Sequence, residues 1–312
     1  MIRRALREVA LFVVALVLSV VVGSFAYDLS SGRVLPVPPL DAHGHRVRAA
    51  GLVTHYEEWG THGSPVVLVH GFLESAQVWS RVGPLLAARG HRVYAIDVRG
   101  FGFTERRGPY TLGADTAQLE GFLSVLHLRR PLLVGHSSGA AIIGDLARID
   151  PSVVGGIVFM DGDGTPYGVG PAWIHALFVD PFATTLIRLA TRHDGLARSI
   201  YAQACGPGCP PFDPRVWLLP QQVAGAEDGL EQILSHQLIG MTYAQEQTIR
   251  VPATVLYGVQ DPQMSAAQAH ATATRLHTHR VHAIPHARHL GMLSSPEARA
   301  GLLDQAAAGS PT

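Results

Sequence analysis

The sequence contains no lysine, so its 24 basic side chains are all arginines, and 24 acidic side chains leave no formal net charge. This balance leaves no global positive field that would favour nucleic acid or another polyanion. Only two cysteines are present, which excludes a disulfide-dense scaffold. Charged residues make up 15% and hydrophobic residues 47% of the 312 positions, which excludes a disordered chain and leaves material for a sizeable core.

Residues 9–27 form an uncharged apolar run behind three arginines near the N-terminus. In a helix this run would be about 28 Å long, close to the roughly 30 Å hydrocarbon core of a bilayer. Its continuous length favours a membrane-spanning signal anchor, whereas Ser24 and Ala26 have the spacing of a cleavable signal peptide. Both alternatives predict that the rest of the chain lies outside the cytoplasm, either membrane-anchored or, after cleavage, secreted.

The two cysteines, Cys205 and Cys209, enclose Gly-Pro-Gly in a short loop that favours a turn. In an oxidising compartment they could form a disulfide, and two free thiols are the alternative. Their spacing fits neither a CxxC redox motif nor a zinc site. We expect no metal and no organic cofactor.

Short apolar runs and helix-like segments alternate through most of the chain after a Pro-rich spacer at 31–39, so residues 1–40 are expected to precede the globular part. The runs lie at 66–70, 92–97, 131–135, 153–160, 253–258 and 280–284, and helical spacing recurs at 77–89 and 115–128. This alternation predicts an α/β fold with a mostly parallel sheet and helices on both faces. Residues 45–59 could add an antiparallel hairpin at the sheet edge.

Residues 164–247 interrupt this alternation with several helix-like segments and no clear strand run. Because the strand pattern returns afterwards, we expect a helical cap inserted into one core formed by residues 41–163 and 248–312. An independent helical domain is the alternative, and the returning strand pattern argues against it.

The segment Gly135-His136-Ser137-Ser138-Gly139 follows one predicted strand and precedes a predicted helix. A sharp strand-to-helix turn of the G-x-S-x-G type presents the serine hydroxyl above a sheet. The N–H groups at the start of the helix could stabilise developing negative charge. Ser137 is therefore the candidate nucleophile, and Ser138 is expected to lie in the helix.

A serine hydroxyl needs a general base, and the base needs an orienting carboxylate. Asp261 follows the apolar run at 253–258, and His289 follows the last predicted strand, which gives the order serine, acid, histidine. His286 is the nearest rival as base, and Asp161, after the run at 153–160, is an alternative acid. The histidines between positions 277 and 289 are also candidate metal ligands, but the cysteines and carboxylates of the sequence form no cluster that would complete such a site.

Five segments together resemble the α/β-hydrolase superfamily, in particular its cap-bearing branch, over roughly residues 41–308. They are His70-Gly71-Phe72, Asp97-Val98-Arg99-Gly100-Phe101-Gly102, the pentapeptide at 135–139, the Asp261 loop and Ile284-Pro285-His286-Ala287-Arg288-His289. The resemblance implies Ser137 as nucleophile, Asp261 as acid and His289 as base. It also implies an oxyanion hole formed by the backbone N–H groups of Phe72 and Ser138.

The sequence departs from relatives that open epoxides or displace halide, because those have Asp at the nucleophile position. The chain has Ser137 there, and Leu73 stands where the epoxide-opening relatives have Pro. Attack on an acyl carbonyl is therefore the favoured chemistry. Asp97 and Arg99 are expected to form a buried structural pair.

The leading hypothesis is a serine hydrolase, carboxylesterase- or lipase-like, that cleaves an ester or related acyl bond of a hydrophobic small molecule. Acyl transfer, peroxyacid formation and carbon–carbon bond hydrolysis use the same residues and remain alternatives. A non-catalytic scaffold with this fold is the alternative from another class. The expected partners are a small-molecule acyl substrate and, through the N-terminal segment, a membrane.

Overall fold

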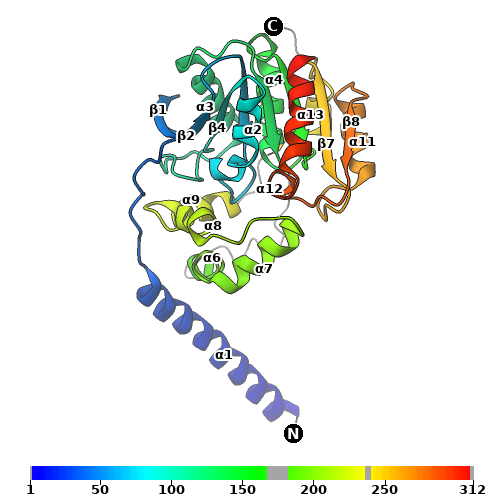
Figure 1. Cartoon of the computed structure of the whole chain (residues 1–312). Helices are drawn as coiled ribbons and strands as arrows, with labels where there is room; N and C mark the ends of the chain where they lie inside the picture. Colours follow the sequence, from blue (N-terminus) through cyan, green and yellow to red (C-terminus); the bar gives the residue numbers. More distant parts are fainter. Residues whose placement is uncertain (1, 167–181, 236–239, 310–312) are drawn as a thin grey trace.

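A computed structural model describes residues 2–166, 182–235 and 240–309 of the chain (Figure 1). Its centre is one eight-stranded sheet with the order β1-β2-β4-β3-β5-β6-β7-β8. The strands are β1 Gly44–Ala49, β2 Leu52–Trp59, β3 Ser64–Val69, β4 His91–Ile96, β5 Leu132–His136, β6 Gly156–Met160, β7 Ala253–Gly258 and β8 Val281–Ile284. All neighbours from β4 to β8 pair in parallel, and β1 and β2 form the antiparallel edge. The predicted fold class and edge hairpin are confirmed.

The central strands are buried on both faces, which explains their uninterrupted apolar sequences. One face packs against α3 (Leu112–Val125), α4 (Gly139–Ile149) and α11 (Ala266–Arg275). The other face packs against α2 (Val82–Ala88) and α13 (Pro296–Ala308), together with η1 (Ala76–Trp79) and α12 (Gly291–Ser294). This covering leaves the loops at the carboxyl ends of the strands as the accessible edge, where ligands bind in open α/β sheets.

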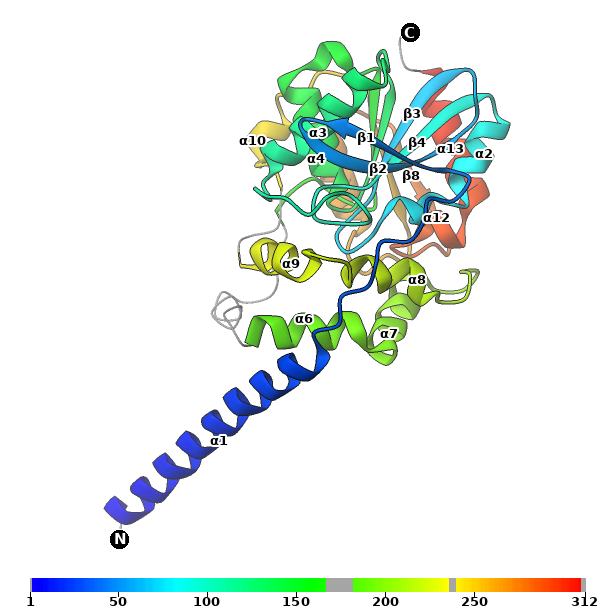
Figure 2. The ribbon, with the colours of Figure 1, turned by 90° about the vertical axis from the view of Figure 1, so that its left-hand side faces the viewer.

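The described residues between 164 and 247 form helices and 3₁₀ turns, with one isolated bridge, Leu35 to Val223, as their only β pairing. Figures 1 and 2 show α6 to α9 as a separate layer beyond the end of the sheet. These elements are α6 Phe182–Arg192, α7 Asp194–Cys205, α8 Pro214–Trp217, η3 Leu219–Gln221 and α9 Ala226–Leu234, while α10 Tyr243–Glu246 packs against α4. The layer therefore covers the edge of the sheet where the candidate site lies.

The long N-terminal helix α1 (Ile2–Ser31) extends away from the rest of the chain (Figure 2). Its segment Leu6–Ser31 has a mean hydropathy of 2.8 in its most apolar window, and only 6% of that window is buried. By length and composition this helix could cross a membrane or serve as a signal sequence. Its last turn contacts the cap layer, where Thr185 Oγ1 donates a hydrogen bond to Asp28 Oδ1 at 3.0 Å.

Cys205 and Cys209 are joined by a disulfide at the end of α7, so the bridged alternative is the one found. The bridge closes the loop that leads out of this helix toward α8. It fixes a local turn of the cap layer.

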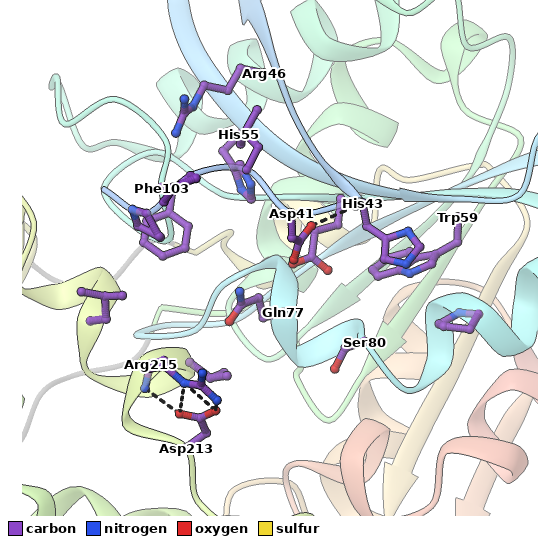
Figure 3. A pocket seen from close by; sticks show the side chains of 17 residues that line it. Asp41, His43, Arg46, His55, Trp59, Gln77, Ser80, Phe103, Asp213 and Arg215 are labelled. Carbon is purple, nitrogen blue, oxygen red and sulfur yellow. Dashed lines mark hydrogen bonds and ion pairs between the residues drawn. The ribbon is translucent and has the colours of Figure 1, made fainter. Parts of the chain in front are cut away.

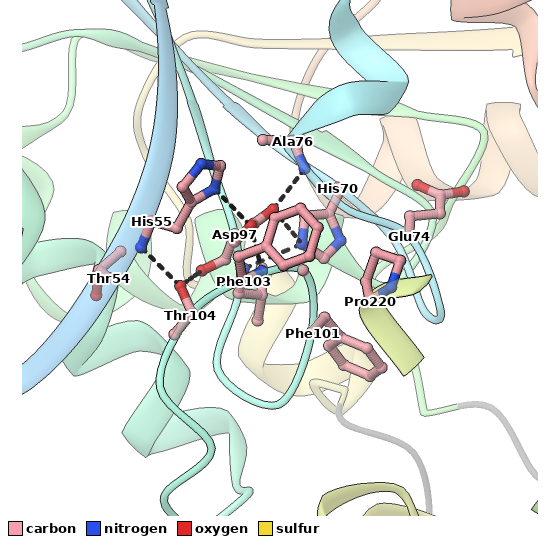
Figure 4. Close-up of polar contacts among 12 residues, drawn as sticks. Thr54, His55, His70, Glu74, Ala76, Asp97, Phe101, Phe103, Thr104 and Pro220 are labelled. Atoms are coloured by element: carbon pink, nitrogen blue, oxygen red, sulfur yellow. Dashed lines mark hydrogen bonds and ion pairs between the residues drawn. The ribbon is translucent and has the colours of Figure 1, made fainter. Parts of the chain in front are cut away.

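The buried pair expected between Asp97 and Arg99 is not formed, and Figure 4 shows Asp97 bonded to His55 and Ala76 instead. Asp97 is hydrogen-bonded to His55 Nδ1 at 2.7 Å and accepts backbone N–H groups from Ala76 and Phe103 at 2.6 and 2.7 Å. These partners saturate the carboxylate, and although burial alone would raise its pKa, the His55 imidazole holds that pKa below the usual value. The expectation was wrong because it relied on proximity in the sequence. The partner of Asp97 is His55, which lies 42 positions earlier in the chain.

Candidate active site

Ser137 lies on the turn between β5 and α4 with a backbone φ of +50°, a left-handed conformation that is rare for a residue with a side chain. The two glycines of the pentapeptide permit this turn. A Cβ at Gly135 would come within 2.5 Å of the Gly139 carbonyl oxygen, and one at Gly139 within 2.6 Å of the Val69 carbonyl oxygen. Close backbone packing therefore holds Ser137 above the sheet, as the sequence predicts.

His289 and Asp261 meet at the same edge of the sheet, after β8 and β7 respectively. His289 Nδ1 and Asp261 Oδ2 are 2.9 Å apart, and both side chains are almost fully buried. His286, the rival base, is exposed on its turn with a φ of +59°. The geometry thus brings His289, not His286, to the acid. With Nδ1 engaged, the other ring nitrogen of His289 is left for proton transfer.

The alternative acid, Asp161, is engaged elsewhere. Its Oδ2 lies 2.6 Å from Arg299 Nη2, and its Oδ1 accepts the backbone N–H of Gly258 at 2.7 Å. Neither ionic side chain is exposed to solvent. Burial raises the pKa of Asp161, an effect that Arg299 opposes. Asp161 therefore has a structural partner of its own, whereas Asp261 has His289.

Phe72 and Ser138, the residues expected to form the oxyanion hole, line one small cavity of about 20 Å³. Among the described residues, neither backbone N–H donates a hydrogen bond to another group. Unpaired N–H groups at a cavity are able to stabilise a negatively charged oxygen. Ser138 is the N-cap residue of α4, so its N–H lies at the positive end of that helix.

A buried Glu74–His136 pair beneath the site was missed by the sequence reasoning. Glu74 Oε2 accepts the backbone N–H of Gly71 at 2.8 Å and lies 2.9 Å from His136 Nδ1. The opposite ring nitrogen of His136 is 2.9 Å from the backbone carbonyl of His289. The pair thus connects the Phe72 loop, the Ser137 turn and the His289 loop. The only signal in the sequence was a histidine inside the pentapeptide.

The charges of this pair follow from burial and mutual attraction. Burial alone would raise the pKa of Glu74, but the His136 imidazole lowers it below the usual value. Burial would lower the pKa of His136, and Glu74 raises it above 6.5 instead. The pair therefore favours a carboxylate and an imidazolium, which strengthens the hydrogen bonds to the Gly71 N–H and the His289 carbonyl.

We predict that Glu74→Gln lowers kcat by about 10- to 100-fold with little change in KM, because the three loops lose the ionic contact that aligns them. Steady-state kinetics on an activated ester would measure the effect. Glu120→Gln, on the exposed face of α3, is the matched control and should behave as wild type. An equal kcat for both variants would contradict the positioning role.

Ser137 and His289 line the same pocket, which has a volume of about 280 Å³. The walls are mostly apolar and come from both the sheet edge and the cap layer. They include Phe72 and Leu73 on one side and Ile200, Tyr201, Phe212 and Trp217 on the other. Such a pocket favours an apolar ligand with its reactive group at Ser137.

Comparison with known proteins places these features in a family. A sequence model of the alpha/beta hydrolase family matches residues 66–302. A 2-hydroxy-6-oxo-2,4-heptadienoate hydrolase from Pseudomonas putida is 37% identical over 139 residues, 42% of this chain and 50% of the relative. Epoxide hydrolase B from Mycobacterium tuberculosis is 32% identical over 189 residues, 58% of this chain and 46% of the relative. The chain thus spans about half the length of these curated relatives.

The solved structures agree at the level of the fold. A membrane phospholipase A described as a bacterial virulence factor superposes with a TM-score of 0.67, is 21% identical and covers 99% of both chains. The family match covers most strands of the sheet and the whole inserted segment 164–247. The chain therefore belongs to the alpha/beta hydrolase family.

Proposed function

We propose that the chain is a serine hydrolase that cleaves an ester or related acyl bond of a small hydrophobic molecule through an acyl-enzyme. The observation that carries the proposal is the 2.9 Å contact of His289 with Asp261, together with the apolar pocket that His289 and Ser137 both line. A nucleophile on a strained turn, a base and an orienting acid are the three parts that acyl transfer requires.

In the proposed mechanism Ser137 Oγ attacks the substrate carbonyl while His289 accepts the hydroxyl proton. Asp261 holds the imidazole and stabilises its positive charge. The N–H groups of Phe72 and Ser138 bind the oxyanion, each contributing about 3 kcal/mol to the barrier reduction. The tetrahedral intermediate collapses as His289 protonates the leaving alcohol. Water, deprotonated by His289, then attacks the acyl-enzyme. The bond between the acyl carbon and Ser137 Oγ breaks as His289 returns the proton to that oxygen, and the acid is released.

The size of the pocket limits the substrate. A volume of about 280 Å³ is at the lower end of the roughly 300–1,000 Å³ of typical ligand sites. A compact, apolar acyl group beside Trp217 and Phe212 fits this space better than a large or polar acyl group. Because one structural neighbour is described as a membrane phospholipase A, a phospholipid belongs in the substrate screen with short-chain aryl esters.

The test is labelling of the detergent-purified full chain with a fluorophosphonate, followed by peptide mapping. We expect one label, on Ser137, and no label on Ser137→Ala or His289→Ala. Ser138→Ala is the matched control and should still be labelled. A folded protein that takes no label, or a label that stays in Ser137→Ala, would overturn the proposal.

A second candidate is hydrolysis of a carbon–carbon bond, favoured by the 37% identity to the Pseudomonas putida hydrolase over 139 residues. The same triad would then act on a 2-hydroxy-6-oxo dienoate. Turnover of that compound at a higher kcat/KM than any ester would favour this candidate. Epoxide opening is disfavoured because Ser137 stands where epoxide-opening relatives have Asp.

We further propose that α1 anchors the protein in a membrane, with the hydrolase on the extracytoplasmic side. The support is the apolar segment Leu6–Ser31, preceded by Arg3 and Arg4. We predict that alkaline carbonate leaves the protein in the membrane pellet and that only detergent releases it. N-terminal sequencing of the pelleted protein checks the alternative, since a new N-terminus at Tyr27 would indicate cleavage and contradict the anchor.

A further inference from the structure

A second cavity, of about 490 Å³, lies away from Ser137 (Figure 3). Its walls come from the spacer after α1, the β1–β2 hairpin, η1 and the cap segment 213–219. None of its lining residues belongs to the pocket of Ser137. The proposed hydrolase mechanism therefore does not use this cavity.

The short helix α8 and the turn after it separate the two cavities. Trp217 and Leu218 line the pocket of Ser137, whereas Val216 and Leu219 line the second cavity. One segment of the cap therefore forms a wall of each. The second cavity is a separate space with its own chemistry.

Two polar side chains on the wall of the second cavity lack partners among the described residues. Glu57, on β2, is 4% exposed, and its carboxyl group has no hydrogen bond in the described part of the chain. Gln77, on η1, has a buried Oε1 without a partner, and Figure 3 shows its side chain pointing into the space. Buried polar groups normally have hydrogen-bond partners. The unpartnered Oε1 of Gln77 and the carboxyl group of Glu57 therefore offer acceptors to a ligand that donates hydrogen bonds.

The other buried polar group on this wall is already engaged. His55 Nδ1 is hydrogen-bonded to Asp97, the carboxylate that also holds the Ala76 N–H (Figure 4). At the cap side, Asp213 and Arg215 neutralise each other, with Arg215 Nη2 2.7 Å from Asp213 Oδ2. In the buried part of the wall, recognition therefore depends on Glu57 and Gln77.

The charge around Glu57 favours a cation. Burial, followed by the negative charges of Asp97 and Asp41, raises the pKa of Glu57 to about 8, against the opposing effect of His55. The same negative charges would stabilise a positive group placed beside the carboxyl. Arg46, the lining cation with no acidic partner in the described residues, is exposed.

Aromatic rings complete the wall. Trp59 is buried, with the His43 ring at a centroid distance of 5.7 Å, and Phe103 stands on the opposite side (Figure 3). Rings of this kind pack against apolar ligand bodies and attract cations over their faces. The cavity therefore combines a polar part, formed by Glu57 and Gln77, with aromatic walls that can pack against the apolar part of a ligand.

We propose that this cavity is a binding site for a protonated primary amine with an aromatic or aliphatic body. The ammonium group donates its N–H bonds to the Glu57 carboxylate and the Gln77 carbonyl oxygen. The body lies between Trp59 and Phe103. The volume of about 490 Å³ is within the usual range for small-molecule sites.

The buried carboxyl also predicts a pH dependence of stability without ligand. The folded-state pKa of Glu57 is above its unfolded value of 4.5, so folding favours the protonated form. Stability is therefore lost as the pH rises from 4.5 to about 8, the interval in which the unfolded chain releases this proton first. We predict that Glu57→Gln becomes progressively more stable than wild type across this interval, measured by urea unfolding. A constant difference from pH 4.5 to 9 would contradict an unpaired buried Glu57.

The binding test is isothermal titration calorimetry of the detergent-purified full chain with 2-phenylethylamine at about pH 8.5, where the amine is still protonated. We expect saturable binding, and at least about tenfold weaker binding of 2-phenylethanol, which lacks the charge. Glu57→Gln and Gln77→Leu should each weaken amine binding, the first by at least about tenfold. Ser137→Ala and Glu120→Gln are controls and should bind as wild type, which separates this site from the proposed hydrolase site.

Three results would overturn the proposal. One is equal affinity for the amine and the alcohol in the wild-type protein. Another is wild-type affinity in both Glu57→Gln and Gln77→Leu, and if Glu57→Gln fails to fold, Gln77→Leu decides this point. The third is no saturable binding of the amine at about 10 mM, well above a weak Kd of about 1 mM.

Discussion

Replacing Ser137 with alanine is expected to lower kcat for ester hydrolysis by about four to six orders of magnitude, because no other described group can form the acyl-enzyme at this turn. His289→Ala should have an effect of similar size, since the hydroxyl then lacks its base. The double variant should lose no more than either single variant, because the two residues act as one unit. Stopped-flow or steady-state assays with an activated aryl ester would measure these changes.

Asp261→Asn is expected to lower kcat by about four orders of magnitude, because the amide no longer holds the imidazole in the required tautomer. His286→Ala is the matched control, since His286 is exposed and does not contact Asp261. It should retain wild-type turnover. Wild-type kcat in Asp261→Asn would remove Asp261 from the mechanism.

Replacing Asp161 with asparagine should destabilise the fold by about 3–5 kcal/mol. Arg299 is fully buried and lies 2.6 Å from Asp161. The variant therefore leaves a buried guanidinium without a counter-charge. Urea unfolding monitored by circular dichroism would give the difference in the free energy of unfolding.

The double variant Asp161→Asn with Arg299→Met should recover much of this loss, because the buried charge is removed together with its partner. Glu297→Gln is the control, since its ion pair with Arg89 is largely exposed and should contribute less than about 1 kcal/mol. A loss in Asp161→Asn no larger than in this control would show that the buried pair is not required.

Substitution of the two aspartates should thus affect different properties of the protein. Asp161→Asn should lose stability while its folded fraction retains turnover. Asp261→Asn should keep its stability and lose turnover. The reverse pattern would make Asp161 the acid and would contradict the assignment based on the His289 contact.

The fold could be predicted from the sequence because each central strand is a short apolar run, and such runs occur in sheets covered on both faces. The proposed catalytic residues could be predicted for a related reason. Ser137, Asp261 and His289 each follow a strand, and the carboxyl ends of parallel strands meet at one edge. The apolar runs that predict the strands were therefore enough to place these three residues at that edge.

The remaining features depend on side chains that meet from distant parts of the chain. The Glu74–His136 pair joins residues 62 positions apart, and no local pattern predicts it. Asp97 was paired with Arg99 because the two are close in sequence, whereas the packing places His55 against it. The second cavity likewise forms only where the spacer, the hairpin and the cap lie together, and the periodicity of the sequence does not predict that arrangement.

β8 lies at one end of the strand order. His289 follows this edge strand, which pairs in the described residues with β7 alone, so the loop that carries His289 is held at one border of the sheet. A chain that has folded only through β6 carries Ser137 without its base, and that hydroxyl is no more reactive than a free one. The proposed hydrolytic activity therefore requires β7 and β8 to be paired, and fraying of this edge would abolish it while most of the core stays folded.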